Sequence, residues 1–318
     1  MRRQYFLALA FACVLPHAAW AADCKALNIV TSLDMTELFP GDVATIPVTV
    51  NGVEKHFLLD TGGTFAQIAP AAADALNLQR QESNIELYAV DGSVSHKSVK
   101  VQDFGLGRLH GGTMLQVSAQ DFGEFDGLFS PVPFTAYDFE VNFAAHKLNV
   151  LSNDHCEGKV VYWPAQALAV VPITIKNLHV TVPVKLDGKD FIAVVDTGSS
   201  HTNIRQDAAL SAFGLRPDSP GMVANGHIGK DENAVRYNYP FKTLTFEGVT
   251  VSNPKVAILP NLMNRNADQS HKINSLIERH SDAVGLPEVI VGMDVLSELH
   301  LYFAFKEKRL YITEASKG

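Results

Sequence analysis

Two aspartates, Asp60 and Asp196, each end an apolar run and open the same tripeptide, Asp-Thr-Gly. A carboxylate at the end of a buried apolar strand is costly unless it has partners. Structural carboxylates usually cap helices or sit in turns. Here Gly62 and Gly198 predict a tight backbone loop just after each aspartate instead. A single copy of so short a motif can occur by chance, whereas two copies in matching surroundings indicate a common function.

The two motifs lie at the same place in an internal repeat. Residues 46–78 and 182–215 share a strand-like run, a glycine turn, a second apolar run ending in Asp-Thr-Gly, and an alanine-rich helical piece. Residues 125–151 and 289–312 extend the repeat, each with a glycine, a short helix-like segment and a terminal strand. Two copies of this length predict a duplicated domain facing its twin rather than a solenoid.

Packing of the halves about a pseudo-twofold axis would bring Asp60 and Asp196 together. Two adjacent carboxylates cannot both ionise easily, so they would share one proton across the working pH range. The ionised member can draw a proton from a bound water while the protonated member hydrogen-bonds a scissile carbonyl. This chemistry needs neither a covalent intermediate nor a metal, and we expect no cofactor.

The segments FLLDTGGT and VVDTGSSHT resemble the active-site loops of pepsin and retropepsin-like aspartic proteases, and IVGMDVL resembles the element that packs behind those loops. The resemblance covers nearly all of the chain and is closer to bacterial retropepsin-like proteins than to pepsin. It implies a mostly β, two-lobed acid-protease fold with pseudo-twofold symmetry. It also implies that Asp60 and Asp196 are catalytic. The residues expected to support the loops are Thr61, Gly62, Thr197, Gly198 and Ser199.

The sequence departs from the family pattern at two places. Gly63 stands where family members usually carry Ser, Thr or Ala, whereas Ser199 can supply a hydroxyl to its aspartate. We therefore expect an asymmetric pair in which Asp60 is less stabilised as an anion. In the first half, Phe125 and Asp126 precede the later glycine in place of two apolar residues. These departures bear on catalytic strength more than on the fold.

Two hairpins are candidates for the flap that, in this family, closes over a substrate. One turns at Asp91-Gly92 with Tyr88 near its tip, and the other turns at Asn225-Gly226. The alternative for each is an ordinary surface hairpin. Two flaps would resemble a symmetric retropepsin dimer fused into one chain, and a single flap would resemble pepsin.

The N-terminus has the three parts of an export signal. Arg2 and Arg3 precede an apolar stretch over residues 5–15, and Ala19-Trp20-Ala21 fits a small-x-small cleavage site. A surface-lying N-terminal helix is the alternative. No later segment is apolar enough to span a bilayer, so we expect no stable membrane insertion. The chain is thus expected to be a periplasmic or secreted bacterial protein.

These features predict the division of the chain. We expect a signal peptide at residues 1–21, an N-terminal protease lobe at 22–153 and a C-terminal protease lobe at 154–318. Cys24 and Cys156 remain after removal of the signal, and an even pair in an exported protein favours a disulfide. Two free thiols, or a lipid anchor on Cys24, are the alternatives.

Composition and motif searches narrow the function classes. The formal net charge of -8 argues against nucleic-acid binding. The histidines are scattered, and neither His-Glu-x-x-His nor Cys-x-x-Cys occurs, which disfavours a metal site. The leading hypothesis is a monomeric aspartic endopeptidase acting on extended peptides or proteins. A catalytically silent retropepsin-like peptide-binding protein and a narrow processing enzyme are the alternatives.

Overall fold

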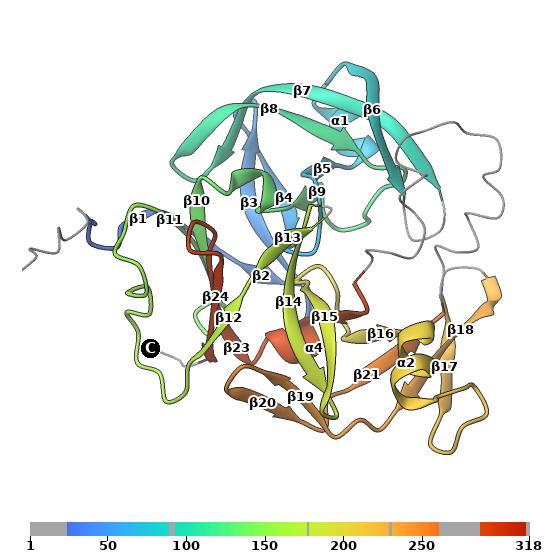
Figure 1. Ribbon diagram of the computed structural model, residues 1–318. Helices are drawn as coiled ribbons and strands as arrows, with labels where there is room; N and C mark the ends of the chain where they lie inside the picture. The colour runs from blue at the N-terminus through green and yellow to red at the C-terminus, as the bar shows by residue number, and fades with distance from the viewer. Residues whose placement is uncertain (1–23, 89–92, 177, 229–230, 261–286, 316–318) are drawn as a thin grey trace, which may run out of the picture.

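The computed structural model of the protein describes residues 24–88, 93–176, 178–228, 231–260 and 287–315 (Figure 1). The expected signal peptide lies outside these residues. The described strands form one sheet in each half of the chain and a third sheet that joins the halves. The mostly β, two-lobed fold that the family resemblance implied is therefore confirmed. No described helix is long and apolar enough to cross a membrane.

The sheet of the N-terminal lobe has the order β2-β3-β4-β9-β5-β8-β7-β6, and the short helix α1 (Pro70–Ala75) follows β5. Its alternating apolar residues turn inward and form the core of the lobe. The strands are β2 (Thr36–Glu37), β3 (Ala44–Val50), β4 (Val53–Leu59), β5 (Gln67–Ile68), β6 (Arg80–Tyr88), β7 (Val94–Leu106), β8 (Leu109–Val117) and β9 (Gly127–Phe129).

The sheet of the C-terminal lobe repeats this arrangement in the order β17-β18-β21-β16-β22-β15-β14-β19-β20, with β13 also paired to β14. The described residues of this half contain two helices, α2 (Gln206–Phe213) and α4 (Met293–Leu296). The strands are β13 (Thr174–Lys176), β14 (His179–Leu186), β15 (Lys189–Val195), β16 (Asn203–Arg205), β17 (Val223–Ile228), β18 (Asp231–Tyr239), β19 (Thr243–Phe246), β20 (Val249–Ser252), β21 (Val256–Leu259) and β22 (Val289–Val291).

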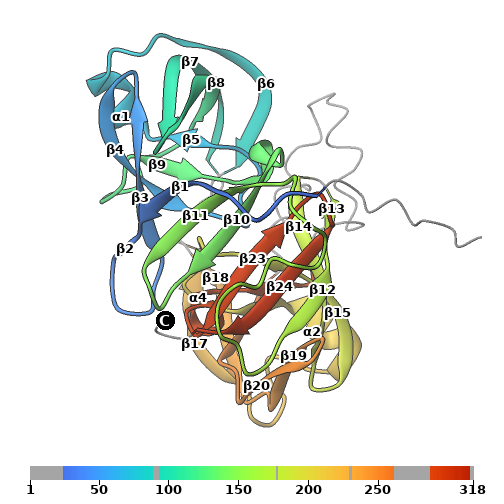
Figure 2. The same ribbon diagram turned by 90° about the vertical axis from the view of Figure 1, so that its left-hand side faces the viewer.

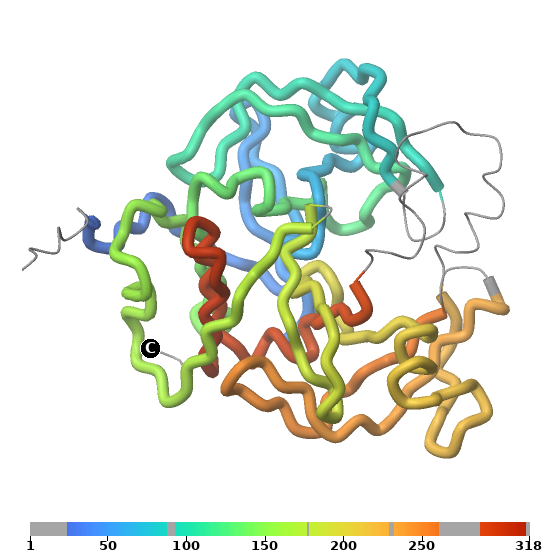
Figure 3. The backbone as a smooth tube through the Cα atoms, viewed as in Figure 1, coloured from blue at the N-terminus to red at the C-terminus, as the bar shows by residue number. Residues whose placement is uncertain are grey.

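The two lobes match residue for residue around the hairpins that lead into the Asp-Thr-Gly loops. In the first hairpin Thr45 lies opposite Leu58, and in the second Thr181 lies opposite Val194. Both numbers of the second pair are those of the first plus 136, which is also the separation of the two aspartates. The hairpins approach each other where the lobes meet (Figure 3). The repeat seen in the sequence is thus a repeat in space.

The third sheet holds the lobes together in the order β1-β11-β10-β23-β24-β12 (Figure 2). Its central pairing joins β10 of the first half to β23 of the second. Hydrogen bonds across this seam fix the relative position of the two loops that carry the aspartates. The strands are β1 (Ile29–Asp34), β10 (Tyr137–Asn142), β11 (Lys147–Ser152), β12 (Ala169–Pro172), β23 (Leu299–Ala304) and β24 (Arg309–Glu314), and the 3-10 helix η1 (Val132–Phe134) precedes β10.

A disulfide joins Cys24 to Cys156 across 132 residues of sequence. Backbone bonds flank it, with the Lys25 N–H donating to the Asp154 carbonyl at 3.0 Å and the Cys156 N–H donating to the Lys25 carbonyl at 3.1 Å. Next to it, the buried imidazole of His155 lies 2.6 Å from the Asp138 carboxylate on β10. The disulfide therefore fastens the start of the described chain to the segment between the lobes.

Replacing both Cys24 and Cys156 by alanine is expected to lower the free energy of unfolding by about 2–4 kcal/mol, because the unfolded chain loses a long covalent loop. Urea unfolding of the two proteins, with and without a reducing agent, measures this difference. The reducing agent should destabilise the native protein and leave the alanine variant unchanged. Equal stability of the two oxidised proteins would contradict the expectation.

Candidate active site

Each aspartate is held at the end of a strand that lies beside a parallel neighbour. β4 pairs with β9 in the first lobe, and β15 pairs with β22 in the second. The Asp60 N–H donates to the Phe129 carbonyl at 2.9 Å, and the Asp196 N–H donates to the Val291 carbonyl at the same distance. The backbone of both aspartates is therefore fixed by equivalent bonds in the two lobes.

The threonines that follow the aspartates connect the two loops through four hydrogen bonds. The N–H of each threonine donates to the hydroxyl of the other at 3.1 Å. The Thr61 hydroxyl donates to the Val195 carbonyl, and the Thr197 hydroxyl donates to the Leu59 carbonyl, both at 2.6 Å. Both threonines are buried. Each hydroxyl is thus both donor and acceptor, and every bond crosses from one lobe to the other.

The carboxyl groups of Asp60 and Asp196 meet above the threonines and are hydrogen-bonded to each other. Both residues are only partly buried, so solvent reaches the pair. Gly198 touches both groups, since a Cβ built on it would lie 2.8 Å from Asp60 Oδ1 and 3.2 Å from Asp196 Oδ1. The two aspartates that the sequence singled out therefore share one site at the junction of the lobes.

Burial and the adjacent carboxylate raise the pKa of Asp60 well above its usual range, and the hydrogen bond to Asp196 adds to this effect. Burial also raises the pKa of Asp196. Several contacts oppose that rise: the Gly198 N–H donates to Asp196 Oδ1 at 2.9 Å, Asp60 donates to it, and the charge of His179 acts on it. Asp60 is therefore the favoured carrier of a proton that the pair shares.

Gly62 packs against the carboxyl group of the opposite lobe. A Cβ on Gly62 would lie 2.4 Å from Asp196 Cγ and 2.6 Å from Asp196 Oδ1. Contacts below 3.0 Å are essentially never seen for real Cβ atoms. The absence of a side chain at this position is thus a requirement of the close carboxyl pair.

Under the hydrolytic mechanism expected from the sequence, Gly62→Ala should lower the turnover of a peptide substrate by about 100-fold or more, because the added methyl group must displace Asp196. A steady-state assay of kcat measures this loss. Gly111→Ala is the matched control, since nothing lies within 4 Å of the Cβ it would add. Comparable activity of the two alanine variants would contradict the expectation.

Ser199, which follows the second Asp-Thr-Gly motif, does not make the predicted hydrogen bond to Asp196. The Ser199 hydroxyl donates to the His201 carbonyl at 2.9 Å rather than to Asp196. At the matching position, a Cβ on Gly63 would lie 2.5 Å from Asp60 Oδ2, so a side chain there would require the Asp60 carboxyl group to shift. The asymmetry of the pair thus has a different origin from the Ser199 hydroxyl.

The segment behind the second loop packs as the family resemblance implied. The Gly292 N–H donates to the Thr202 hydroxyl at 3.0 Å, and that hydroxyl donates to Asp294 Oδ1 at 2.6 Å. In the first lobe, the Asp126 carboxylate binds β4 instead. It lies 3.1 Å from Lys55 Nζ and accepts a hydrogen bond from the His56 N–H at 3.0 Å. The aspartate that departs from the family pattern at position 126 is therefore partly exposed and fastens its segment to β4.

The structure bears differently on the two hairpins that were predicted as flaps. β6 and β7 pair antiparallel up to Tyr88 and Val94, while Asp91 and Gly92 lie outside the described residues. The turn predicted at Asn225-Gly226 is wrong, because both residues lie inside β17, where the pairing with β18 is irregular between Ala224 and His227.

Gly226 explains why that turn was misplaced. It has a φ of +77°, a left-handed conformation that glycine adopts readily in a bulge as well as in a turn. An Asn-Gly pair therefore indicates a local left-handed residue without deciding between these two structures.

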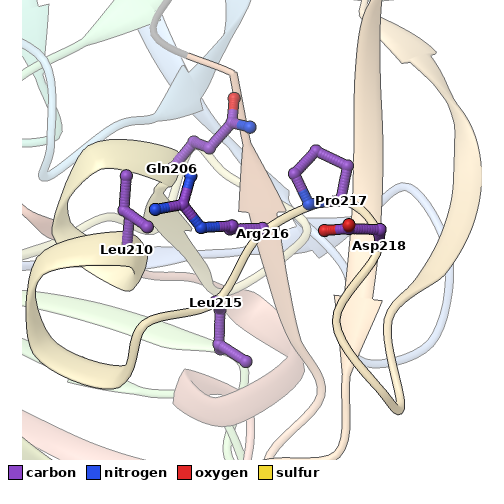
Figure 4. A pocket seen from close by; sticks show the side chains of 6 residues that line it. All are labelled: Gln206, Leu210, Leu215, Arg216, Pro217 and Asp218. Atoms are coloured by element: carbon purple, nitrogen blue, oxygen red, sulfur yellow. The ribbon is translucent and has the colours of Figure 1, made fainter.

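The described residues contain no group of three or more His, Cys, Asp or Glu side chains placed to hold a metal ion. A shallow pocket beside α2 includes none of the site residues (Figure 4). It is lined by Gln206, Leu210, Leu215, Arg216, Pro217 and Asp218.

His179 belongs to the site and was missed by the sequence interpretation. Its Nδ1 atom lies 2.7 Å from the Gly62 carbonyl oxygen in the other lobe. The only signal in the sequence was its position in the repeat, seventeen residues before Asp196, where the first half has Val43 before Asp60.

Comparisons with known proteins bear on the family and the fold of the chain. A family model described as "Aspartyl protease" matches residues 46–129 and 182–295, which include both Asp-Thr-Gly motifs. The crystal structure of aspartic proteinase from Irpex lacteus is similar, with a TM-score of 0.52 and 14% sequence identity, over 92% of this chain and 98% of that chain. At this identity the likeness shows the fold alone. No curated protein sequence matches the chain.

Proposed function

The chain belongs to the aspartyl protease family, and we propose that it is an aspartic endopeptidase in which Asp60 and Asp196 activate a water molecule. The observation that carries this proposal is the pair of partly exposed carboxyl groups that meet at the junction of the lobes, where burial raises the pKa of both and the adjacent carboxyl raises that of Asp60 further. A pair of this kind holds a general base and a general acid side by side.

The reaction follows from the charge of the pair. The Asp196 carboxylate takes a proton from the bound water, and the water oxygen bonds to the carbonyl carbon of the peptide. The protonated Asp60 gives its proton to the carbonyl oxygen, so a neutral gem-diol forms. The C–N bond then breaks as a proton passes from Asp196 to the leaving nitrogen and a proton returns from the gem-diol to Asp60. The products are a carboxylic acid and an amine, and the enzyme regains its starting state.

The hydrogen bonds of the two threonines hold the loops, and with them the two carboxyl groups, at a fixed separation. Because Thr61 and Thr197 bind the backbone of the opposite lobe, the separation of the carboxyl groups does not depend on mobile side chains. A fixed separation keeps the reacting groups near their productive positions before the substrate binds.

The substrate class and the cellular setting complete the proposal. A peptide in extended form would bind between the lobes, with the β6–β7 hairpin as its flap and Tyr88, Asp91 and Gly92 near the tip. The protein would be exported after removal of residues 1–21, with lobes at 22–153 and 154–318. The Cys24–Cys156 disulfide supports an oxidising compartment.

Incubation of residues 22–318 with a mixed peptide library, from acid to neutral pH, tests this function. We expect internal cleavage, and the cut sites would define the specificity. The second candidate, a silent peptide-binding protein, is favoured by Gly63, which has no hydroxyl to offer Asp60. Absence of cleavage at every pH, together with tight binding of library peptides, would overturn the endopeptidase and support the second candidate.

A further inference from the structure

The strand register, continued two residues past the last paired residues of each hairpin, sets different residues level with the two aspartates. The β14–β15 pairing includes Thr181 opposite Val194, and extending it by two residues brings His179 opposite Asp196. The same extension in the first lobe, from Thr45 opposite Leu58, brings Val43 opposite Asp60. Cross-strand neighbours lie on one face of a sheet. The pseudo-twofold symmetry of the site is therefore broken by a histidine on one side and a valine on the other.

The His179 imidazole also reaches the loop of the other lobe. Its Nδ1 atom lies 2.7 Å from the Gly62 carbonyl oxygen, and the ring is partly buried. A carbonyl oxygen can only accept, so Nδ1 carries a hydrogen whether the ring is neutral or charged. Protonation at Nε2 therefore adds a positive charge without breaking this bond. Val43 is apolar and buried, and it offers neither a donor nor a charge.

We propose that His179 is a positioning residue that makes the two carboxyl groups unequal, holding the negative charge on Asp196 and leaving the shared proton on Asp60. Its catalytic meaning rests on the proposed function. The contact with Gly62 holds the imidazole beside the Asp196 carboxyl group, because Gly62 itself packs against that group. A charged ring at this place favours the ionised form of Asp196 and opposes the rise of its pKa that burial causes. Asp196 is thereby the general base, and Asp60 is the general acid.

His179 also acts on Asp60, but less directly. The Gly62 carbonyl that accepts from His179 belongs to the same peptide group as the Gly63 N–H, which donates to the Asp60 carboxyl. Chains of this kind strengthen a hydrogen bond by about 10–30%. A full charge on the imidazole acts directly on Asp196, so the direct effect decides which carboxyl group is ionised.

The charges that face His179 are few. Lys176 on β13 pairs with it across the ladder and is exposed, while Asp60 and Asp196 face it from the two loops. Of the other strands packed against β14, β12 and β19 carry no titratable residue, and β15 carries Lys189 and Asp190 at its far end. Lys176 is thus the one neighbouring cation on these strands whose removal can serve as a control.

Two substitutions separate the charge of His179 from its hydrogen bond. His179→Asn keeps an amide donor near the position of Nδ1 and removes the charge, whereas His179→Val introduces the residue of the first lobe and removes both. Without the positive charge, Asp196 needs a higher pH to ionise. The acid limb of the pH profile of kcat/KM should therefore move up by about one pH unit in both variants. kcat should fall about tenfold in the valine variant alone.

The ¹³Cγ NMR signals of labelled aspartates in the full chain give the same information without turnover. The signals of the pair are those lost or shifted in Asp60→Asn and Asp196→Asn. The lower titration step of the pair should move up in both His179 variants and stay unchanged in Lys176→Gln, which removes a charge outside the site. Because this measurement needs no cleavage, it tests the inference even if the protein proves to be a silent binder.

Two results would overturn the inference. The first is an unchanged lower titration step in a His179→Val protein whose thermal unfolding is as cooperative as that of the native protein. The second is an equal shift in Lys176→Gln, which would assign the effect to overall charge. If the valine variant fails to fold, the asparagine variant decides the question in the same way.

Discussion

Asp60→Asn and Asp196→Asn are each expected to reduce kcat/KM by at least about 1000-fold while the protein remains folded. Asparagine has nearly the same shape as aspartate, so the loops and the threonine bonds should persist. It can neither take a proton from water nor donate one as an acid. Because the two carboxyl groups act as one unit, the double variant should lose little more activity than either single variant.

Peptide cleavage by the three variants, measured beside the native protein, checks this loss. Asp190→Asn is the matched control, because that carboxylate is exposed and lies on β15 away from the loops. Activity that survives both single substitutions would place the chemistry elsewhere. A loss that is also seen in Asp190→Asn would point to damage of the fold.

The same substitutions should change the dependence of stability on pH. Burial and Asp196 raise the pKa of Asp60 in the folded state, so the fold favours the protonated form. This contribution to stability is present at low pH and is lost as the pH rises from the usual aspartate range through the raised pKa. Asp60→Asn removes this loss. In thermal unfolding at neutral pH, the variant should therefore be at least as stable as the native protein, and a clear loss of stability there would contradict the assignment of the raised pKa.

Thr197→Val is expected to lower the free energy of unfolding by about 2–6 kcal/mol. Valine fills the same volume but lacks the hydroxyl. The substitution leaves the Thr61 N–H without its acceptor and the Leu59 carbonyl without its donor, and both groups are buried. Each buried unsatisfied group costs about 1–3 kcal/mol. Thr61→Val should have a similar effect, because its two bonds are the mirror image of these.

Urea unfolding of the native and variant proteins measures this cost. Thr197→Ser keeps the hydroxyl and should recover most of the lost stability. Thr250→Val is the matched control, since Thr250 is exposed on β20 and bonds only to the hydroxyl of Thr245 among the contacts of its described side chain. If Thr197→Val is as stable as Thr250→Val, the lobes are held together by the central sheet without help from the loops.

The positions of Asp60 and Asp196 could be predicted because they depend on local patterns that occur twice. An apolar strand, a tripeptide with a glycine and a following helix each have a recognisable spacing. Their duplication then implied a symmetric partner for each loop. The two extended segments that end each half were also predicted, but the direct pairing of β10 with β23 was not. An edge strand does not reveal in its own sequence which other edge it joins.

The other differences between the sequence-based predictions and the structure arise from hydrogen-bond partners that local sequence does not specify. The bond from His179 to Gly62 spans 117 residues and links the lobes, so neither sequence neighbourhood indicates it. Ser199 could have donated to a carboxylate or to a carbonyl, and the nearby His201 carbonyl accepts it. At Asn225-Gly226 the sequence correctly indicated a left-handed residue. The strand nevertheless continues through it, because β18 pairs with β17 on both sides of the irregularity.

Binding of a statine-type transition-state mimic tests most directly whether Asp60 and Asp196 form one hydrolytic centre. The hydroxyl group of statine occupies the place of the attacking water, and a deoxy analogue lacks it. Calorimetry on the native protein should give one mimic per chain, with the hydroxyl form bound at least about 100-fold more tightly. This preference should disappear in Asp60→Asn and in Asp196→Asn. Equal affinity for the two forms in the native protein, or a preference that survives both substitutions, would contradict the assignment of the pair as the catalytic centre.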